Sequence, residues 1–281
     1  SLTGGPNIHL WVLDTGRPDF DSRISGAAKL VRVDLDTDRV MQTIVFPDDV
    51  ARKTSYLAGV TIDLRWGESG AAFVTDASEM GMNGLIVVDL ESGESWRKLD
   101  LHPSTRATKE FLPIVEGRPM YFHPEGYQRS YLSLGANGVT IDAGGERLFY
   151  RPMAGRELYS VRLDALFDRD MPPDRVESTL RRYGNLGFAS DGLTSDDVGR
   201  LYMANYEDGA IVRQLDDGTL ETVVYDPRIL WPDSFAMTDG YLYVTVNQRH
   251  RQSVFNYGID REELPYAVFR TPLDAGPVRL K

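Results

Sequence analysis

Hydrophobic and polar positions recur along this chain in a repeated phrase that predicts pairs of short β-strands. Each copy has a short strand marked by a small residue or by an Asn-Gly or Asp-Gly element, then a turn, then a second strand rich in Leu, Tyr, Phe and Val. Four copies span residues 57–76, 137–150, 191–205 and 233–245, and a further strand phrase covers residues 10–14. Repeats of this kind are typical of a β-propeller, which concentrates function at its axial channel.

Two outer strands are expected to follow each inner pair, so that four antiparallel strands form one blade. Residues 84–90 with residues 95–99 illustrate such an outer pair. Turn signals rich in Gly, Asp and Ser separate the strands. Five blades are visible in this way, and we expect residues 267–270 and 278–280 to supply outer strands of the last one. The whole chain, residues 1–281, is expected to form a single propeller domain.

Two long irregular inserts, residues 103–131 and 249–265, interrupt the repeat. Loops of this length in a compact domain often act as lids or binding loops. The second insert begins with Arg249-His250-Arg251, for which we expect a solvated loop, with an anion-binding rim as the alternative. Helical character is confined to residues 163–168.

Composition and motifs exclude several classes of function. The net charge is −11, which repels nucleic-acid phosphates. No apolar run approaches the roughly 20 residues that span a bilayer. The absence of cysteine excludes disulfides and thiolate sites, and the four histidines lack the spacing of a zinc pair. Neither a Gly-x-Ser-x-Gly elbow nor a strand-to-helix G-x-G-x-x-G loop is present, which argues against a serine hydrolase and a dinucleotide cofactor.

Polar residues at equivalent points of the repeat are expected to ring one mouth of the channel. The loops that enter the inner strands contribute Tyr56, Asn137, Asp191 and Asp233. The loops that leave the second strands contribute Asp14, Asp76, Arg151, Asn205, Tyr206 and Asn247. Convergent polar groups in a concave place predict a site for a small-molecule ligand.

These residues also have structural interpretations. Asn137, Asp191 and Asp233 could cap backbone N–H groups of turns, although their recurrence at equivalent points favours a channel ring. For Asp14 and Asp76 we favour the capping of a loop. For Tyr56, Tyr206 and Trp231 we favour packing between blades over stacking on a ligand. Arg151 stands in an apolar strand, where it could pair with a channel carboxylate or bind an anionic substrate through two hydrogen bonds.

Several stretches resemble the Yellow / major royal jelly protein family in a bacterial form. They are residues 10–16, 29–35, 84–90, 95–97, 190–192, 231–234 and 242–247, in the family's order. The resemblance implies a six-bladed β-propeller, with the family's first blade missing from this chain. It also implies a secreted or periplasmic protein, although no signal peptide is visible. Family members are linked to dopachrome conversion, to the binding of biogenic amines in the channel, or to storage.

This chain departs from the family pattern in ways that affect function. It lacks the disulfides of insect members, and it has Ala58-Gly59 where related sequences tend to have Asn-Asp. The second change removes two polar groups from the channel mouth. Because one fold hosts many functions, the resemblance implies the fold more firmly than any activity.

A second similarity is to the SMP-30/gluconolactonase propellers, which are calcium-dependent lactonases. Residues 137–139 and 191–193 are similar to two ligand-bearing segments of that family. The similarity implies Asn137 and Asp191 as metal ligands, with Ca²⁺ as the candidate ion, since both offer hard oxygen atoms. The early Glu of that family is absent, and Ala58 stands near where another Asn is expected.

Two functions therefore stay open from the sequence. The leading one is the binding of an aromatic or amine-bearing small molecule in the channel, with tautomerase or isomerase chemistry in which Asp191 and Asp233 move protons. The alternative is a calcium-dependent, lactonase-type hydrolase, in which the ion polarises a carbonyl or activates water. A scaffold that binds protein partners fits a polar channel mouth least well.

Overall fold

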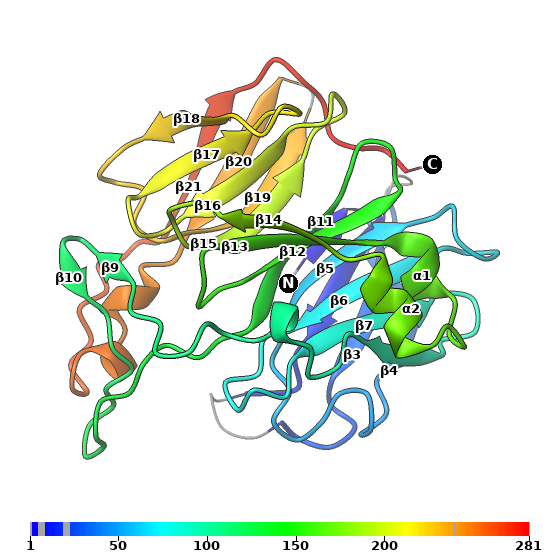
Figure 1. Cartoon of the computed structure of the whole chain (residues 1–281), viewed down its shortest axis with the longest axis horizontal. Helices are drawn as coiled ribbons and strands as arrows, with labels where there is room; N and C mark the ends of the chain where they lie inside the picture. The colour runs from blue at the N-terminus through cyan, green and yellow to red at the C-terminus, as the bar shows by residue number, and fades with distance from the viewer. Residues whose placement is uncertain (1, 5–8, 19–22, 239, 281) are drawn as a thin grey trace.

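The computed structural model describes residues 2–4, 9–18, 23–238 and 240–280, and within them the chain forms five antiparallel sheets of three or four strands and one small two-stranded sheet (Figure 1). The first sheet comprises β1 (Leu2–Gly4), β2 (His9–Asp14), β3 (Lys29–Asp34) and β4 (Arg39–Val45), and the second comprises β5 (Leu57–Asp63), β6 (Ala71–Asp76), β7 (Gly84–Asp89) and β8 (Ser95–Lys98). The third comprises β11 (Ala136–Ile141), β12 (Arg147–Pro152), β13 (Glu157–Arg162) and β14 (Arg181–Asn185). The fourth comprises β15 (Ser190–Ser195), β16 (Leu201–Asn205), β17 (Ala210–Gln214) and β18 (Leu220–Tyr225), and the fifth comprises β19 (Pro232–Thr238), β20 (Tyr241–Val246) and β21 (Ala267–Pro272).

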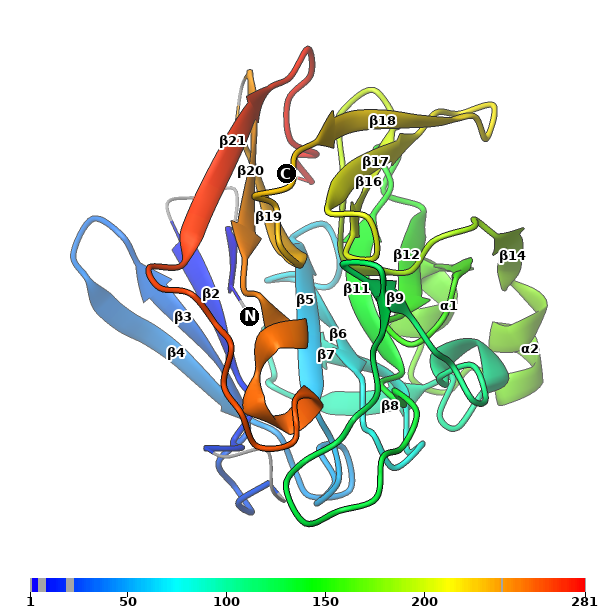
Figure 2. The ribbon, with the colours of Figure 1, turned by 90° about the vertical axis from the view of Figure 1, so that its left-hand side faces the viewer.

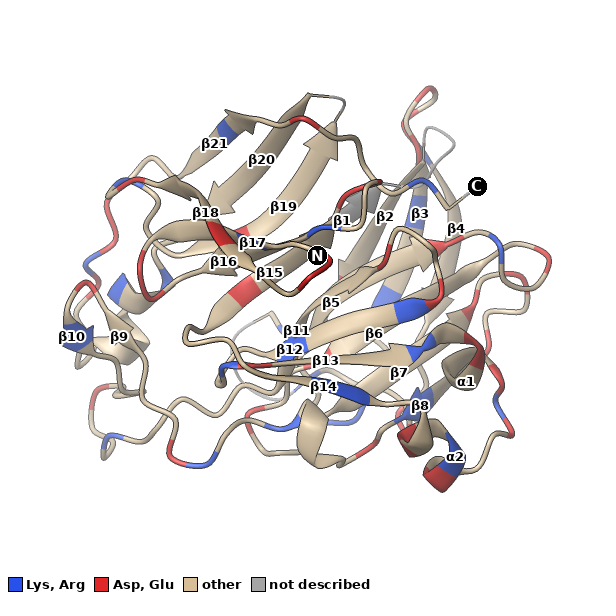
Figure 3. Cartoon of the chain, turned by 45° about the horizontal axis from the view of Figure 1, so that its top comes forward, with Lys and Arg blue, Asp and Glu red and all other residues tan. Residues whose placement is uncertain are grey.

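The sheets are the blades of a β-propeller, as the repeat predicts. Strands follow chain order within each blade, as the labels β2 to β4 and β5 to β8 show (Figure 2). The first strands β1, β5, β11, β15 and β19 are successive neighbours around the axis. The described residues contain five blades, so the sixth blade implied by the family resemblance stays a prediction. Acidic and basic positions are interspersed over loops and strand ends (Figure 3).

Apolar side chains fill the interfaces between successive blades. Trp11 and Leu30 of the first blade pack with Leu57 and Ile86 of the second in one buried cluster. Similar clusters join the second blade to the third, the third to the fourth and the fourth to the fifth. The alternating or continuous apolar strand patterns of the sequence therefore reflect burial of both faces of most blades.

The end of the chain departs from the prediction. Residues 267–270 form the third strand of the fifth blade, as expected, within β21. Residues 278–280 are not a strand of this blade: Pro277 makes an isolated bridge with Asp196, and Leu280 packs on the cluster between the second and third blades. The expected helical piece is α1 (Leu163–Phe167), and a second short helix, α2 (Pro173–Ser178), follows it.

A shift of register recurs near the start of four inner strands. It falls between Leu57 and Val60, Ala136 and Gly138, Ser190 and Leu193, and Pro232 and Phe235. The second residue of each strand, at Ala58, Asn137, Asp191 or Asp233, is therefore equivalent in the four blades and lines the channel. Such bulges commonly redirect side chains near functional sites.

Close packing of the inner strands explains the recurrent glycine after these residues. A Cβ at Gly59 would lie 2.5 Å from the carbonyl oxygen of Asn137 in the next strand. Cβ atoms at Gly138 and Gly192 would come closer still to the carbonyl oxygens of Asp191 and Asp233. The Asn-Gly and Asp-Gly elements thus mark contacts between strands. The turn-capping interpretation of Asn137, Asp191 and Asp233 is wrong, because the hydrogen bonds found for their side chains join them to other side chains.

The two inserts pack on each other and form a structure that we call the cap, residues 103–131 and 249–265. The cap contains η1 (Pro103–Thr105), β9 (Ile114–Val115), β10 (Arg118–Pro119), η2 (Arg249–Arg251) and η3 (Ser253–Phe255). His123 N–H donates to the carbonyl of Val254 at 2.7 Å, and Tyr257 N–H donates to the carbonyl of His123 at 3.0 Å. Among the described residues, no helix has the length and apolar character needed to cross a membrane.

Candidate functional site

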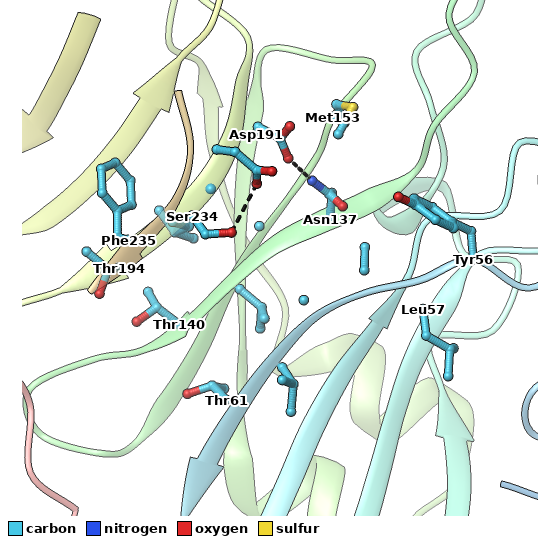
Figure 4. A pocket seen from close by; sticks show the side chains of 18 of the residues that line it. Tyr56, Leu57, Thr61, Asn137, Thr140, Met153, Asp191, Thr194, Ser234 and Phe235 are labelled. Atoms are coloured by element: carbon cyan, nitrogen blue, oxygen red, sulfur yellow. Dashed lines mark hydrogen bonds between the residues drawn. The ribbon is translucent and has the colours of Figure 1, made fainter. Parts of the chain in front are cut away.

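One mouth of the channel holds a cavity of about 280 Å³ (Figure 4). Its wall comes from the inner strands β5, β11, β15 and β19, and the cap adds Arg249. Backbone and small side chains form much of the wall, with hydroxyl groups at Thr61, Thr140 and Thr194. The cavity is therefore polar, and Tyr56 and Phe235 are the aromatic side chains among its lining residues.

Asp191 is the most buried acid of this cavity, with 2% of its surface exposed. One carboxyl oxygen accepts a hydrogen bond from Asn137 Nδ2, and the other accepts one from Trp231 Nε1 at 2.7 Å. Burial raises the pKa of Asp191 to about 8, with a further rise from the negative charge of Asp233. Arg249 and the two hydrogen bonds oppose this rise, but they do not outweigh it.

Asp233 occupies the equivalent position on the neighbouring strand β19 and is partly exposed to the cavity. Its Oδ2 atom accepts a hydrogen bond from Asn247 Nδ2 at 2.8 Å, and its Oδ1 atom accepts one from Ser234 Oγ at 3.1 Å. The structure therefore brings the two predicted proton-transfer residues, Asp191 and Asp233, together in one cavity.

Arg249 supplies a positive charge to the same cavity, and 9% of its surface is exposed. Burial alone lowers the pKa of this guanidinium, but Tyr56 and the two carboxyl groups raise it above its usual value. The expectation of a solvated loop at residues 249–251 is wrong, because His250 and Arg251 are also tied to the cap through Glu116.

An aromatic stack that includes Trp231, a hydrogen-bond donor to Asp191, packs beside this carboxyl group. The rings of Tyr206 and Trp231 are parallel within 11°, with centroids 4.0 Å apart, and the centroid of the His250 ring lies 6.0 Å from that of Trp231 at an interplanar angle of 16°. The Tyr206 hydroxyl donates to the carbonyl of Met153 at 2.7 Å. Burial holds the pKa of Tyr206 well above its usual range. Tyr206 and Trp231 are each 1% exposed, so both pack as we favoured from the sequence.

Besides Tyr206, two predicted ligand-binding residues lie outside this cavity. Arg151 is fully buried, where Nη2 donates to the carbonyl of Phe188 at 2.7 Å and the guanidinium lies 5.0 Å from the Phe188 ring centroid. Burial lowers the pKa of Arg151 to about 10. Asn205 holds the turn after β16, since its Oδ1 atom accepts from the N–H groups of Glu207 and Asp208.

The remaining predicted residues divide between the cavity and its support. Tyr56 lines the cavity, and Asn247 reaches it through the hydrogen bond to Asp233. Asp76 is fully buried and binds Ser55, Tyr56 and Arg97, while Asp14 binds Lys29 and the backbone N–H of Gly16. Residues at the ends of second strands thus mostly hold loops in place, because they lie one strand away from the axis.

The residues at this mouth do not fit a calcium site. Ca²⁺ takes six to eight oxygen ligands. Asn137 and Asp191 are adjacent, but the asparagine directs Nδ2 rather than its oxygen at the carboxylate, and Arg249 adds a positive charge nearby. Within the described part of the chain, no three His, Cys, Asp or Glu residues gather where they could hold a metal ion.

The sequence does not place Arg249 or Trp231 in the channel ring: it offers residues 249–251 only as an alternative anion-binding rim and Trp231 as a packing residue. Arg249 follows β20 by three residues, so it belongs to the same class of loop that led to Asn247. Trp231 directly precedes β19 in a left-handed backbone conformation (φ 57°). Tryptophan rarely adopts this conformation, so its presence here could not be predicted from residue preferences.

The fold and the site define a β-propeller with a polar, ligand-sized cavity at one mouth of its channel. The chain belongs to the major royal jelly protein family: the family model described as "Major royal jelly protein" matches residues 7–277. The family predicted from the sequence is therefore confirmed, whereas the bacterial form and the secreted or periplasmic location stay predictions. No curated protein sequence matches the chain.

Solved structures with a similar fold include enzymes of different kinds. A luciferin-regenerating enzyme is 14% identical with a TM-score of 0.56, and the match covers 100% of this chain and 80% of that one. A gluconolactonase from Xanthomonas campestris is 13% identical with a TM-score of 0.53, covering 88% of this chain and 69% of that one. A streptogramin B lyase is 11% identical with a TM-score of 0.50, covering 87% of this chain and 60% of that one. At these identities the likeness shows the fold alone.

Proposed function

We propose that this protein binds a small organic molecule at the channel mouth and moves protons on it, as a tautomerase or isomerase does. The observation that carries the proposal is the pair of carboxyl groups at Asp191 and Asp233 in one cavity. Their surroundings differ, since Asp191 is buried on the aromatic stack and Asp233 is partly exposed. Two carboxyl groups in different environments are suited to opposite roles in proton transfer.

The chemistry assigns the acid role to Asp191 and the base role to Asp233. With a pKa of about 8, Asp191 carries a proton at neutral pH and can donate it. Asp233 takes a proton from one atom of a bound conjugated molecule, while Asp191 delivers its proton to another atom of the same molecule. The substrate keeps its composition, and the proton on Asp233 returns to Asp191 through water to complete the cycle.

Neighbouring side chains fix the two carboxyl groups for these roles. Asn137 and Trp231 hold Asp191, and Asn247 and Ser234 hold Asp233. Tyr56 offers an aromatic face at the mouth, which supports an aromatic ligand. An ammonium group on the ligand would find its counter-charge in Asp233. The aromatic or amine-bearing ligand class expected from the sequence stays a proposal on these grounds.

The calcium-dependent lactonase is not favoured as a second function. It needs an oxygen-rich donor set, and this mouth combines a hydrogen-bonded Asn137–Asp191 pair with the guanidinium of Arg249. Calcium therefore enters no step of the proposed mechanism.

The experiment follows tautomerisation of the enol of phenylpyruvate and of ortho-quinones derived from catechols by ultraviolet absorbance. The wild-type chain is expected to accelerate at least one of these reactions over buffer. Asp191→Asn and Asp233→Asn should each reduce the rate by about 100-fold or more, the usual contribution of a general acid or base. Asp217→Asn, in an exposed turn, serves as the matched control and should retain the wild-type rate. Folded Asp191→Asn and Asp233→Asn variants with unchanged rates would overturn the proposal.

A further inference from the structure

A further cavity, of about 650 Å³, lies within the cap, between the hairpin β9–β10 and the segment that follows β20 (Figure 1). We call it the cap cavity. The charged side chains in its wall are Glu116, Arg118, Arg251, Arg261 and Glu263. It shares no lining residue with the cavity at the channel mouth, so the two are separate places on the molecule.

Positive charge prevails in the cap cavity, although the chain as a whole carries a net charge of −11. Three arginines and two glutamates line the wall. His250, which also lines it, is neutral at pH 7, because burial lowers the pKa of its ring. A positive concave place on an acidic chain attracts small anions locally.

The three arginines differ in whether they already have partners. Arg251 donates to both carboxyl oxygens of Glu116, through Nε at 3.2 Å and through Nη2 at 2.8 Å, and its Nη1 atom lies 3.3 Å from Glu263 Oε1. The side chains of Arg118 and Arg261 are exposed, and neither forms a hydrogen bond or an ion pair with another described residue. Two guanidinium groups of the wall therefore keep their donors free for a ligand.

Glu116 holds the two walls of the cap cavity together. With Gly117 it forms the two-residue turn between β9 and β10, where the φ angles of the two residues are 50° and 73°. Such a turn favours asparagine and glycine, so a glutamate is locally unfavourable there. Its Oε2 atom lies 2.7 Å from His250 Nε2, and both of its oxygens accept from Arg251. The hairpin is thus fixed against the second segment before a ligand arrives, which lowers the ordering cost of binding.

We propose that the cap cavity binds a small organic phosphate through the guanidinium groups of Arg118 and Arg261. Each guanidinium presents paired N–H donors in one plane, and such a pair matches two oxygens of an oxyanion. A phosphate monoester carries about two negative charges at neutral pH, so it can satisfy both groups, whereas a carboxylate carries one. Tyr257, which is 63% exposed, offers aromatic surface to the organic part of the ligand.

The remaining surface argues against a larger anion. A nucleic acid would extend beyond the cap cavity onto a chain of net charge −11, which repels its phosphates. The inference does not rest on the proposed function, because none of its residues lines the cavity of Asp191 and Asp233.

The test measures binding of phenyl phosphate, inorganic phosphate, benzoate and benzyl alcohol by calorimetry on the full chain at pH 7.5. We expect phenyl phosphate to bind wild-type protein at least about tenfold more tightly than each other probe, which corresponds to about 1.4 kcal/mol. Arg118→Met and Arg261→Met should each weaken its binding by about tenfold, and the corresponding lysine variants should retain part of it. Arg129→Met is the matched control, since Arg129 belongs to the same cap but lies over the Tyr121 ring, outside the cap cavity.

Each outcome decides the inference. Unchanged phenyl phosphate affinity in folded Arg118→Met and Arg261→Met would overturn it, because the binding would then lie elsewhere on the chain. Benzoate or benzyl alcohol bound as tightly as phenyl phosphate would overturn the phosphate class, and inorganic phosphate bound as tightly would overturn the organic part. Absence of phenyl phosphate binding at millimolar concentration would overturn the site. Weaker binding in both methionine variants, with wild-type affinity in Arg129→Met, would establish it.

Discussion

Trp231 donates its indole N–H to Asp191 Oδ2 at 2.7 Å, and this bond joins the proposed acid to the aromatic stack at the base of the cap. The tryptophan lies in a left-handed backbone conformation, which tertiary packing must hold in place. Tyr206 and His250 stack with its indole ring and supply part of that packing. The orientation of a carboxyl group in the blades therefore depends on residues contributed by two different loops.

Replacement of Trp231 by Phe should raise the pKa of Asp191 above the wild-type value of about 8. The indole N–H stabilises the ionised form, so its loss favours the protonated form, while the phenyl ring keeps part of the stack. Carbon-13 NMR of labelled aspartate carboxyl groups gives the midpoint directly. Trp96→Phe removes an indole bond to the carbonyl of Leu166, outside the cavity, and should leave this midpoint in place. An unchanged or lower midpoint in Trp231→Phe would contradict the assignment.

The raised pKa of Asp191 also predicts how stability depends on pH. The folded state holds the Asp191 proton up to its raised pKa of about 8, whereas the unfolded chain releases it near the ordinary aspartate pKa of 3.8. Between these limits the native state binds more protons, so the contribution of this group to the free energy of unfolding falls as pH rises. The stabilising contribution of Asp191 is fully present below pH 3.8 and is lost as the pH rises to about 8. Each pKa unit corresponds to about 1.4 kcal/mol.

Urea denaturation at several pH values across this window tests the linkage. Asp191→Asn cannot ionise at this position, so its free energy of unfolding should fall less steeply with pH than that of wild type. Asp217→Asn should follow the wild-type slope, because its carboxylate lies in an exposed turn. Parallel curves for wild type and Asp191→Asn would show that Asp191 titrates normally in the folded state.

Calcium is expected to leave the melting temperature of the wild-type chain unchanged, as is EDTA. An ion that binds only the folded state at a hundredfold excess over its Kd stabilises it by about 2.7 kcal/mol. The Asn137–Asp191 hydrogen bond and the nearby guanidinium make such binding unfavourable. Differential scanning calorimetry with millimolar Ca²⁺ checks this. A clear upward shift that disappears in Asp191→Ala would reverse our conclusion about the metal.

Gly192→Ala should destabilise the propeller strongly. The added Cβ would collide with the carbonyl oxygen of Asp233, which belongs to the backbone of the next inner strand and cannot rotate away. We expect a loss of about 2–3 kcal/mol or more in the free energy of unfolding, as for other overpacked sites. Gly144→Ala is the control, because the nearest side-chain atom there lies 3.9 Å from the added carbon. A Gly192→Ala variant as stable as Gly144→Ala would refute the packing explanation.

The blades could be predicted from sequence because each one repeats a local pattern. Strand pairs, the turns between them and the equivalence of Asn137, Asp191 and Asp233 all follow from periodicity within a few tens of residues. The role of the glycines could not be predicted in this way, because the carbonyl that excludes a side chain at Gly138 belongs to a strand more than fifty residues away. The sequence pattern therefore identified the Asn-Gly and Asp-Gly dipeptides correctly, but it attributed them to local turns and not to contacts between distant strands.

The cap was beyond prediction for a different reason. Its contacts join segments with no shared pattern, such as Glu116 with His250 and Arg251. A basic tripeptide on a loop carries the same sequence signal whether it faces solvent or a cavity. Likewise, the sequence shows only that Arg151 is unusual in an apolar strand, and it does not distinguish a pair with a channel carboxylate from the binding of an anionic substrate. Its burial against the Phe188 carbonyl depends on the neighbouring blade.

Because Arg249 comes from the cap, the site has two parts that differ in how far substitution is tolerated: the acids of the blades and the cation of the cap. The blades fix the acids through strand packing that tolerates little change, as the glycine contacts show. The cap supplies the cation from a loop that the blades do not need for their own pairing. Substitutions at residues 249–265 therefore change the charge of the cavity without altering strand pairing, and through Arg249 and His250 they also act on Asp191.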